Sequence, residues 1–274
     1  MIDVDVIVLD LDGGALLDDC LASIAAQTLA PKRVLVFDNG SRVPVPPGDG
    51  VEVLRSETNL GFTGGVNAAF ARTTAPFVAL VNNDVVLDRD WLATVAEAMK
   101  DETVAAAQTI LRRDATTIDG AGIDISDGTI RQLGSGLPLG SPLPPAWGVS
   151  ATAALYRASA FGQSGDSVAA LRKEVFDPRF FAYYEDVELC ARLHERGHRT
   201  IVIAEAKAMH RGSQSAARLG KRAAYLRTRN RYFVARLHRG VGRLPALLWE
   251  DLRLLLRGRG SLRGMIAGVC SKLS

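Results

Sequence analysis

Two adjacent carboxylates, Glu185 and Asp186, follow a run of aromatic residues in the segment FFAYYEDVELCARL. If the segment continues as a helix, spacings of three and seven residues place Asp186 on the same face as Leu189 and Leu193. A carboxylate in partly apolar surroundings can have a raised pKa and act as a general base, whereas the start of a helix lowers the pKa of a carboxylate. The segment therefore supports catalysis and helix capping equally for Asp186, and it leaves the pKa open.

Glu185 has a different predicted environment from its neighbour. The same helical spacing groups it with Glu188 and Arg192, which are four residues apart and suited to form an ion pair. We therefore expect Glu185 to face solvent. An acidic residue in the first turn of a helix interacts favourably with the helix dipole, which explains Glu185 without any chemistry.

Polar side chains also gather where three predicted strands end. These clusters are Asp10 with Asp12, Asp38 with Asn39, and Asn82 with Asn83 and Asp84. In a parallel sheet the carboxyl ends of the strands meet at one edge, where ligands bind. At that edge Asp84, flanked by amides, could hold a divalent cation on a diphosphate, and Asp38 could accept a hydrogen bond from a nucleobase or ribose. The alternative for each cluster is a polar turn.

Two further features could serve the same edge. The segment NLGFTGGVN, residues 59–67, is rich in glycine and precedes a predicted helix, so its backbone N–H groups could meet phosphate. It matches neither the P-loop nor the GxGxxG pattern, and a loop before a capped helix is the alternative. His210, after another predicted strand, could complete a metal site or be an ordinary surface residue.

The elements that must position these residues alternate along the chain. Apolar runs predict strands at 4–10, 33–41, 51–56, 76–87, 104–111 and 199–206, and helical spacing predicts helices at 15–27, 61–74 and 90–100, the last with Asp90 as N-cap. Alternation of strands and helices predicts a largely parallel α/β sheet. Residues 112–146 are rich in Gly, Ser and Pro and predict a long loop or hairpin.

Composition bounds the class of protein. The 274 residues are 47% hydrophobic, enough for one large domain with or without an appendage. The widely spaced Cys20, Cys190 and Cys270 favour a reducing compartment and argue against a structural zinc site. The first residues lack the basic region of a signal peptide, and no run of 18 apolar residues exists, so we expect a cytoplasmic protein without a spanning helix.

The net charge of +3 conceals a strong asymmetry. Residues 211–274 carry 15 Lys and Arg against two acids, whereas residues 1–210 carry 18 against 28 acids. A basic tail on an acidic body indicates an anionic partner for the tail.

The ordered set of motifs resembles family 2 glycosyltransferases of the GT-A fold, above all bacterial rhamnosyltransferase-like and galactofuranosyltransferase-like members. The resemblance rests on VIVLDLDGG, LASIAAQTL, VFDNGS, NLGFTGGVNAAF, VNNDVVLDRDWL, SATAALYR, FDPRFFAYYEDVELCARLHERGH and HRGSQS, which together span residues 4–215, and RNRYFVARLH beyond them is also similar. It implies a mixed, mostly parallel sheet flanked by helices, with the nucleotide sugar at its carboxyl edge. We expect a catalytic domain at 1–215, with a nucleotide-sugar part at 1–111 and an acceptor part at 112–215, and a basic helical tail at 216–274.

The resemblance also implies roles for individual residues. Asp186 would be the catalytic base, and Asp84 with His210 would bind Mg²⁺ or Mn²⁺. The nucleotide sugar would contact Asp10, Asp12, Asp38, Asn59, Gly61, Asn67, Asn82 and Asn83, and the acceptor side would comprise Trp147, Ser150, Ala151, Thr152, Tyr184 and Glu185. Three departures stand out: Leu11 and Asp12 replace a usual Tyr-Asn pair, Ala151 replaces a glycine, and residues 162–172 are an extra stretch.

These parts predict an inverting, metal-dependent transfer of a hexosyl or deoxyhexosyl group in cell-envelope biosynthesis. The donor would be a nucleotide-diphosphate sugar, and the acceptor a hydroxyl of a polysaccharide or lipid-linked glycan. One displacement suffices, without the second carboxylate nucleophile of a retaining glycosidase. The alternatives are a sugar nucleotidyltransferase, although the chain lacks the Gly-rich basic loop expected near its start, and a non-catalytic nucleotide-sugar or membrane-binding module.

The basic tail has three interpretations. Nucleic-acid binding is disfavoured because no recognisable motif is present, and a solvated helical extension is the simplest alternative. The stretch LPALLWEDLRLLLRG, residues 244–258, places Leu and Trp beside Arg as interfacial helices do. The resemblance implies polyprenyl-diphosphate-linked acceptors at the inner face of the cell membrane, so we favour peripheral association of the tail with an anionic membrane surface.

Overall fold

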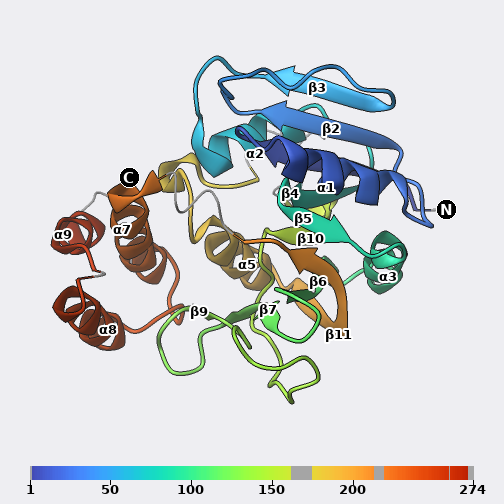
Figure 1. Cartoon of the computed structure of the whole chain (residues 1–274). Coiled ribbons are helices and arrows are strands. Elements are labelled where there is room, and N and C mark those ends of the chain that lie inside the picture. Colours follow the sequence, from blue (N-terminus) through green and yellow to red (C-terminus); the bar gives the residue numbers. More distant parts are fainter. Residues whose placement is uncertain (1, 162–174, 213–218, 259, 271–274) are drawn as a thin grey trace.

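Four parallel strands form one half of the central sheet in the computed structural model, which describes residues 2–161, 175–212, 219–258 and 260–270 (Figure 1). The sheet has nine strands, ordered β3-β2-β1-β4-β10-β6-β11-β5, with β7 paired to β6. Their bounds are β1 Val4–Asp10, β2 Arg33–Asp38, β3 Val51–Arg55, β4 Phe77–Asn82, β5 Val85–Leu87, β6 Val104–Arg112, β7 Ile118–Gly120, β10 Ala153–Arg157 and β11 Arg199–His210. Strand β10 is antiparallel to both β4 and β6, so the sheet is mixed.

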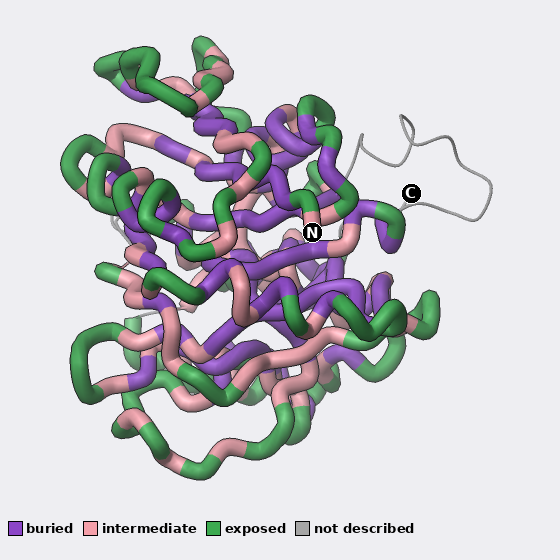
Figure 2. The backbone as a smooth tube through the Cα atoms, turned by 90° about the vertical axis from the view of Figure 1, so that its right-hand side faces the viewer, coloured by how far each residue is buried: buried purple, intermediate pink, exposed green. Residues whose placement is uncertain are grey.

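Helices cover both faces of this sheet. The helices in the described part of the chain are α1 Ala15–Ala25, α2 Gly61–Phe70, α3 Trp91–Ala98, α5 Glu185–Glu195, α7 Lys221–Leu237, α8 Leu244–Leu256 and α9 Leu262–Cys270, with short 3₁₀ turns η1 Ala158–Phe161 and η2 Pro178–Phe180. In β1, Val6 and Val8 pack with α1 and α3 while Ile7 packs with α2, α5 and α7. The strand is therefore apolar on both faces, as expected for a parallel strand between two helical layers. Buried backbone runs through the centre and exposed loops surround it (Figure 2).

Several predicted elements differ from the structure in their extent. The single strand predicted at 76–87 is wrong, because a turn at Asn83 and Asp84 divides it into β4 and β5. Strand β5 leaves the centre of the sheet and pairs antiparallel with the end of β11 at the edge. The strand predicted at 199–206 continues to His210, with irregular register after Ile203. Asp90 stands at the N-cap of α3, but its side chain makes no capping bond and pairs with Lys207 instead.

The loop predicted at 112–146 contains only short strands. Besides β7, a two-stranded sheet forms from β8 Ile123–Asp124 and β9 Arg131–Gln132. An isolated bridge joins Ile123 to Gly148, which anchors the far end of the loop just before β10. This segment therefore lies beside the carboxyl-edge residues rather than apart from them.

The tail divides into a buried helix and two outer helices. Phe233 and Val234 of α7 belong to the main core, and the ring of Phe233 lies 5.2 Å from that of Phe180. Helices α8 and α9 lie outside α7, at one margin of the molecule (Figure 1). The structure thus makes α7 part of the globular body and leaves α8 and α9 on its surface.

Candidate active site

A cavity of about 540 Å³ opens at the carboxyl edge of the sheet. Its position follows from register, because Asp10 of β1 pairs with Asp38 of β2, and Leu9 of β1 pairs with Asn82 of β4. The three strands thus end at one level, as their polar ends predicted. Sequence-predicted residues that line the cavity are Asp10, Asn59, Gly61, Asn82, Asn83, Asp84, Ser150, Ala151, Thr152, Tyr184, Glu185, Asp186 and His210.

Asp10 organises the floor of the cavity. It is 1% exposed, and its carboxylate accepts hydrogen bonds from Asn83 Nδ2 at 2.6 Å and Ser41 Oγ at 3.3 Å. Gly13 passes so close that an added Cβ would lie 2.1 Å from Asp10 Oδ1. Asp10 therefore holds the loop after β1 and the turn after β4 together.

Asp38 is not among the residues that line the cavity. Its fully buried carboxylate accepts hydrogen bonds from the backbone of Ser41 at 2.8 Å and Val45 at 3.1 Å, and it pairs with Arg55. Burial raises the pKa of Asp38, but these bonds outweigh it and hold the pKa below its ordinary value. The neighbouring Asn39 lines the cavity instead and donates to Gly61 O at 3.0 Å.

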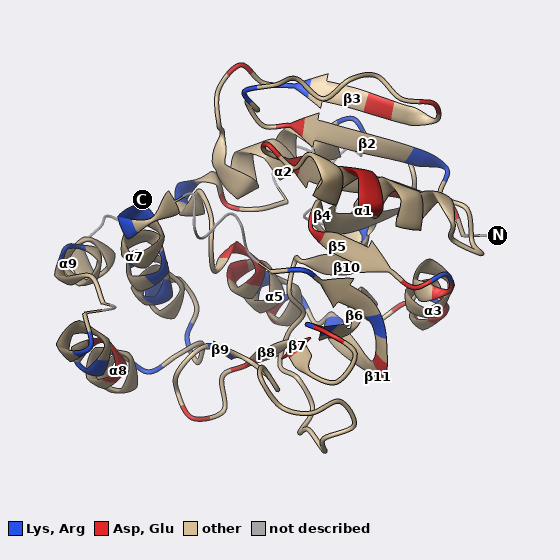
Figure 3. Cartoon of the chain, viewed as in Figure 1, with Lys and Arg blue, Asp and Glu red and all other residues tan. Residues whose placement is uncertain are grey.

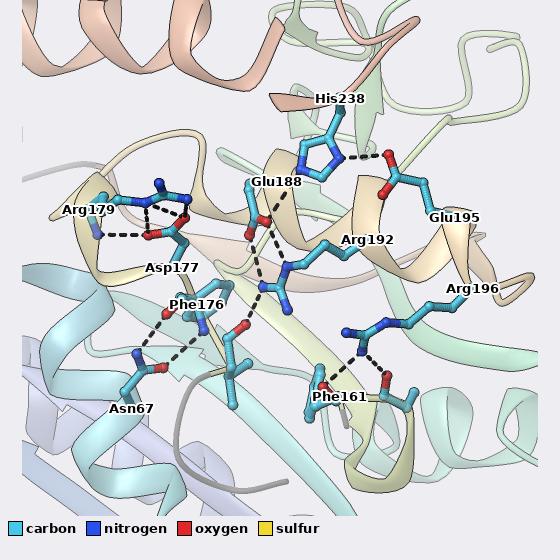
Figure 4. A network of polar contacts seen from close by, with 12 residues as sticks. Asn67, Phe161, Phe176, Asp177, Arg179, Glu188, Arg192, Glu195, Arg196 and His238 are labelled. Carbon is cyan, nitrogen blue, oxygen red and sulfur yellow. Dashed lines mark hydrogen bonds and ion pairs between the residues drawn. The ribbon is translucent and has the colours of Figure 1, made fainter. Parts of the chain in front are cut away.

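Three more predicted residues are not among those that line the cavity. Asp12 accepts from the backbone of Arg42 at 2.8 Å, and Asn67 bonds both backbone groups of Phe176, at 2.7 and 3.0 Å (Figure 4). Trp147 packs its ring edge-on against His194, with centroids 4.9 Å apart.

Gly61 is required at the glycine-rich helix start. Its φ is +77°, and an added Cβ would lie 2.5 Å from the carbonyl oxygen of Phe181. Thr63 N donates to the same carbonyl at 3.2 Å. The start of α2 thus touches the aromatic segment before α5, which brings the two halves of the cavity together.

Asp84 and His210 meet at the metal position proposed from the sequence. His210 Nε2 lies 3.3 Å from Asp84 Oδ2, and Nδ1 lies 2.7 Å from Asp119 Oδ2. Burial lowers the pKa of His210, but the bonds to Asp119 and Asp84 outweigh it and raise the pKa to about 9. Asp119 was not anticipated, because it comes from β7, 91 residues before His210.

The residues at this position fit a divalent cation in part. Asp84 Oδ1 is buried and has no hydrogen-bond partner among the described residues, which leaves a hard oxygen free to ligate. No group of three or more His, Cys, Asp or Glu side chains arranged to hold a metal occurs in the described part of the chain. A cation here would therefore need oxygens from a bound diphosphate and water, as Mg²⁺ sites at phosphates usually do.

Glu185 and Asp186 both face the cavity, so the prediction that Glu185 faces solvent is wrong. Glu185 is 7% exposed and Glu188 only 3%. Helical spacing was correct for the pair of Glu188 with Arg192, whose Nε lies 2.6 Å from Oε1. That pair is covered by His238, which follows α7 (Figure 4). The face is buried because other elements pack on it, which spacing within α5 does not reveal.

The pKa of Asp186 is raised. Burial outweighs the hydrogen bonds that its carboxylate accepts from the backbone of Ala151 at 3.3 Å and of Val187 at 2.9 Å. Burial, and then the adjacent charge of Asp186, raise the pKa of Glu185 well above its ordinary value. Because the two carboxylates are adjacent, the charge of one opposes ionisation of the other. The effect of burial, which raises both pKa values, outweighs the lowering effect of the helix start.

The aromatic segment before α5 has an unusual backbone. Phe181, Tyr183 and Tyr184 have φ of +64°, +71° and +68°, values that non-glycine residues rarely adopt. Such conformations persist only where the surroundings enforce them. Here Asn230 Nδ2 of α7 lies within 3.0 Å of the carbonyl oxygens of Phe180, Ala182 and Tyr183.

Sequence reasoning missed Asn230 as a residue that shapes the site. The one signal in the sequence was the stretch RNRYFVARLH, which is similar to the family but indicated no role for Asn230. Arg227, from the same helix, was also missed: it lines the cavity, and its guanidinium lies 4.5 Å from the ring centre of Tyr183.

Residues 6–165 match the sequence model of glycosyl transferase family 2. The chain belongs to glycosyltransferase family 2. It is 28% identical to an N-acetylglucosaminyl-diphospho-decaprenol L-rhamnosyltransferase of Mycobacterium tuberculosis, over 91% of this chain and 88% of that protein. It is 31% identical to a pre-mycofactocin glycosyltransferase of the same organism, over 61% of this chain but only 35% of the relative.

Solved structures support the fold. A mannosyltransferase from Pyrobaculum calidifontis, solved with GDP-Man and Mn²⁺, aligns with a TM-score of 0.58 at 17% identity, over 98% of this chain and 76% of that one. Staphylococcus aureus TarS 1–349, solved with UDP-GlcNAc, aligns with a TM-score of 0.57 at 18% identity, over 86% of this chain and 65% of that one. The GT-A fold expected from the sequence is thereby confirmed, and this family 2 chain is a glycosyltransferase.

Proposed function

We propose that this glycosyltransferase is inverting and metal-dependent, and that it moves a hexosyl or deoxyhexosyl group from a nucleotide-diphosphate sugar to an acceptor hydroxyl. One observation carries the proposal: Asp84, whose buried Oδ1 has no hydrogen-bond partner among the described residues, and Asp186, whose pKa is raised, line the same cavity from the turn after β4 and from α5. The first suits a cation on the diphosphate, and the second suits a base for the acceptor.

The proposed reaction divides the work among the residues of the cavity. Asp186 accepts the proton of the acceptor hydroxyl as that oxygen bonds to the anomeric carbon, and the bond from that carbon to the diphosphate breaks. Ala151 N–H, 3.3 Å from Asp186 Oδ2, orients the base. A bound Mg²⁺ or Mn²⁺ would neutralise charge on the departing nucleoside diphosphate. A single displacement of this kind inverts the anomeric centre.

Donor contacts are assigned to the sheet side of the cavity. Asn39, Asn59 and Gly61 line the cavity there, and Asp10 holds Asn83 in place. We assign Asp38 to support of this wall through Arg55 and Ser41, and Asp12 and Asn67 to support of neighbouring loops.

The acceptor is assigned to Ser150, Ala151 and Thr152, which directly precede β10, and to Tyr184, which directly precedes α5. Because a relative is named for a diphospho-decaprenol acceptor, we propose a lipid-linked glycan and a role in cell-envelope polysaccharide or glycolipid synthesis, at the inner face of the cell membrane.

The division into parts at 1–111, 112–215 and 216–274 stays a prediction, as does the absence of a nucleic-acid partner. The stretch 162–172 lies outside the described residues.

Thermal unfolding with donors tests this proposal. A ligand that binds the native state raises the melting temperature, so UDP-, dTDP- and GDP-sugars are compared with and without Mn²⁺. We expect one nucleotide class to raise the melting temperature, and more so with Mn²⁺. No rise with any donor would contradict the proposed donor site.

A further inference from the structure

Helix α8 is amphipathic, but most of its large apolar side chains are exposed rather than packed on the protein. The residues that it buries are Leu247 and Asp251, and Asp251 pairs with Arg231 of α7. Its exposed residues include Leu248 at 46%, Trp249 at 57% and Leu256 at 81% exposure. A surface helix normally turns its apolar side chains to the core and its charges to water. Here an ion pair faces inward while leucines face outward.

Helix α9 also turns an apolar face outward, because its glycines pack against α7. An added Cβ at Gly264 would lie 2.8 Å from Tyr225 O, and one at Gly268 would lie 2.7 Å from Arg229 O, so both glycines are pressed against α7. With the glycine face inward, Leu262, Ile266 and Val269 are left exposed. The outward apolar face of α9 thus follows from how it packs.

We call these exposed side chains the outer apolar surface: Leu244, Leu248, Trp249, Leu252, Leu256, Leu262, Ile266 and Val269. They are eight of the eleven large hydrophobic residues exposed in the described part of the chain. Their concentration on two short helices marks an interaction surface, since scattered exposed apolar residues are normal but grouped ones are not. None of the described helices is long and apolar enough to span a bilayer.

The charges around this surface indicate its partner. Arg253 lies 5.0 Å from the ring centre of Trp249, and Arg257 at the end of α8 and Arg263 on α9 are exposed. The acids of residues 211–274 are Glu250 and Asp251, and both pair with Arg231. Figure 3 shows Lys and Arg along all three tail helices. Apolar side chains bordered by exposed arginines suit an anionic lipid surface, where arginines meet phosphates and leucines enter the acyl boundary.

We propose that α8 and α9 lie in the plane of an anionic bilayer and dock the chain through the outer apolar surface. The proposal does not depend on which transfer reaction the chain catalyses. It does concern the cavity, because α7 contacts both the cavity and α8. Asn230 and Arg231 are neighbours on α7: the first holds the aromatic segment at the cavity, and the second holds α8. One helix therefore connects the docking surface to the site, which suits an acceptor embedded in lipid.

Vesicle flotation tests the proposal with the full chain. Vesicles of phosphatidylcholine alone are compared with vesicles that also contain phosphatidylglycerol. We expect binding to the anionic vesicles, weakened by salt, with a blue shift of Trp249 fluorescence. Trp249 can report insertion because Trp91 is fully buried and Trp147 packs on His194. Absence of binding to anionic vesicles would overturn the proposal.

Matched variants locate the surface. Leu248→Glu with Leu252→Glu and Ile266→Glu should lower vesicle affinity at least about tenfold, since burial of even one leucine is worth that much. Val43→Glu with Leu137→Glu changes exposed apolar residues elsewhere and should bind as the parent chain does. Melting temperatures of both variants check folding. Unchanged affinity in the first variant overturns the proposal, as does a dimer seen by light scattering that the same variant dissociates, because a second copy would then occupy the surface.

Discussion

The side-chain amide of Asn230 donates a hydrogen bond to the main-chain carbonyl of Tyr183 at 2.7 Å, across 47 residues of sequence. Tyr183 stands at φ +71° and Tyr184 at +68°, immediately before the helix that carries Asp186. A residue on α7 therefore holds the segment that leads into α5, the helix that carries the proposed base. Rigid support of this kind determines how accurately a catalytic group is placed.

Replacement of Asn230 by alanine should affect both stability and transfer. The carbonyls of Ala182 and Tyr183 would lose the hydrogen bonds from Asn230 in a partly buried setting, at a cost of about 1–3 kcal/mol, whereas Phe180 O keeps those from Ala182 N and Arg229. We expect kcat to fall about tenfold or more, because a displaced base loses its geometry. Urea unfolding and initial rates measure the two effects. Lys221→Ala, at an exposed position on the same helix, is the control, and a kcat equal to the parent in Asn230→Ala would refute the positioning role.

Asp186→Asn should remove transfer while the donor still binds. Loss of a general base costs about 10²–10⁴ in rate. The donor-induced rise in melting temperature should persist, because the donor contacts are assigned to other residues of the cavity, among them Asn39, Asn59 and Gly61. Because burial raises the pKa of Asp186, parent activity should rise with pH as the pair with Glu185 loses its proton. Glu185→Gln is the matched comparison, and the assignment of the base would pass to Glu185 if that variant lost transfer and Asp186→Asn kept it.

The proposed metal position can be separated from donor binding. Asp84→Ala should abolish the part of the donor-induced rise in melting temperature that depends on Mn²⁺. Asp119→Asn removes the charge that orients His210 at 2.7 Å and should weaken Mn²⁺ affinity about 10–100-fold. Asp114→Asn, an exposed change in the same loop, serves as control. Equal Mn²⁺ titrations of all four proteins would exclude this position.

His238 should make stability depend on pH. Burial lowers its pKa, but hydrogen bonds to Glu188 and Glu195 outweigh this and raise the pKa above the usual 6.5. A raised pKa in the folded state means stabilisation that is fully present below about pH 6.5 and lost as pH rises through the folded value. The free energy of unfolding of His238→Gln should therefore fall below the parent mainly at low pH. Urea unfolding across pH 5–9 measures the difference, and a difference constant with pH would contradict the role of the charged histidine.

Local patterns predicted much of the framework. Continuous apolar runs identified β1, β2 and β4, and the polar residues at their ends placed Asp10, Asn82, Asn83 and Asp84 at one edge. Both signals depend on residues close together in sequence. A polar turn at Asn83 and Asp84 was one of the alternatives, but the separate strand β5 after it was not predicted, because β5 pairs with β11, more than a hundred residues later.

What individual side chains do at the site depended on partners far along the chain. Asp38 is engaged by Arg55 from the next strand, and Asn67 by Phe176, 109 residues away. Glu185 was expected in solvent and is buried. In each case the residue type was compatible with several environments, and packing selected one of them.

By itself the sequence determined the alternation of strands and helices, the polar edge of the sheet and the basic, leucine-rich tail, because each of these features depends on residues that are close together in the sequence. Only the tertiary structure decided that Asp186 and Glu185 share a wall, that Asp119 reaches His210, and that α8 turns Asp251 inward and its leucines outward. Burial and hydrogen bonding between distant segments made those decisions, and helical or strand periodicity carries no information about which distant segment will cover a given face.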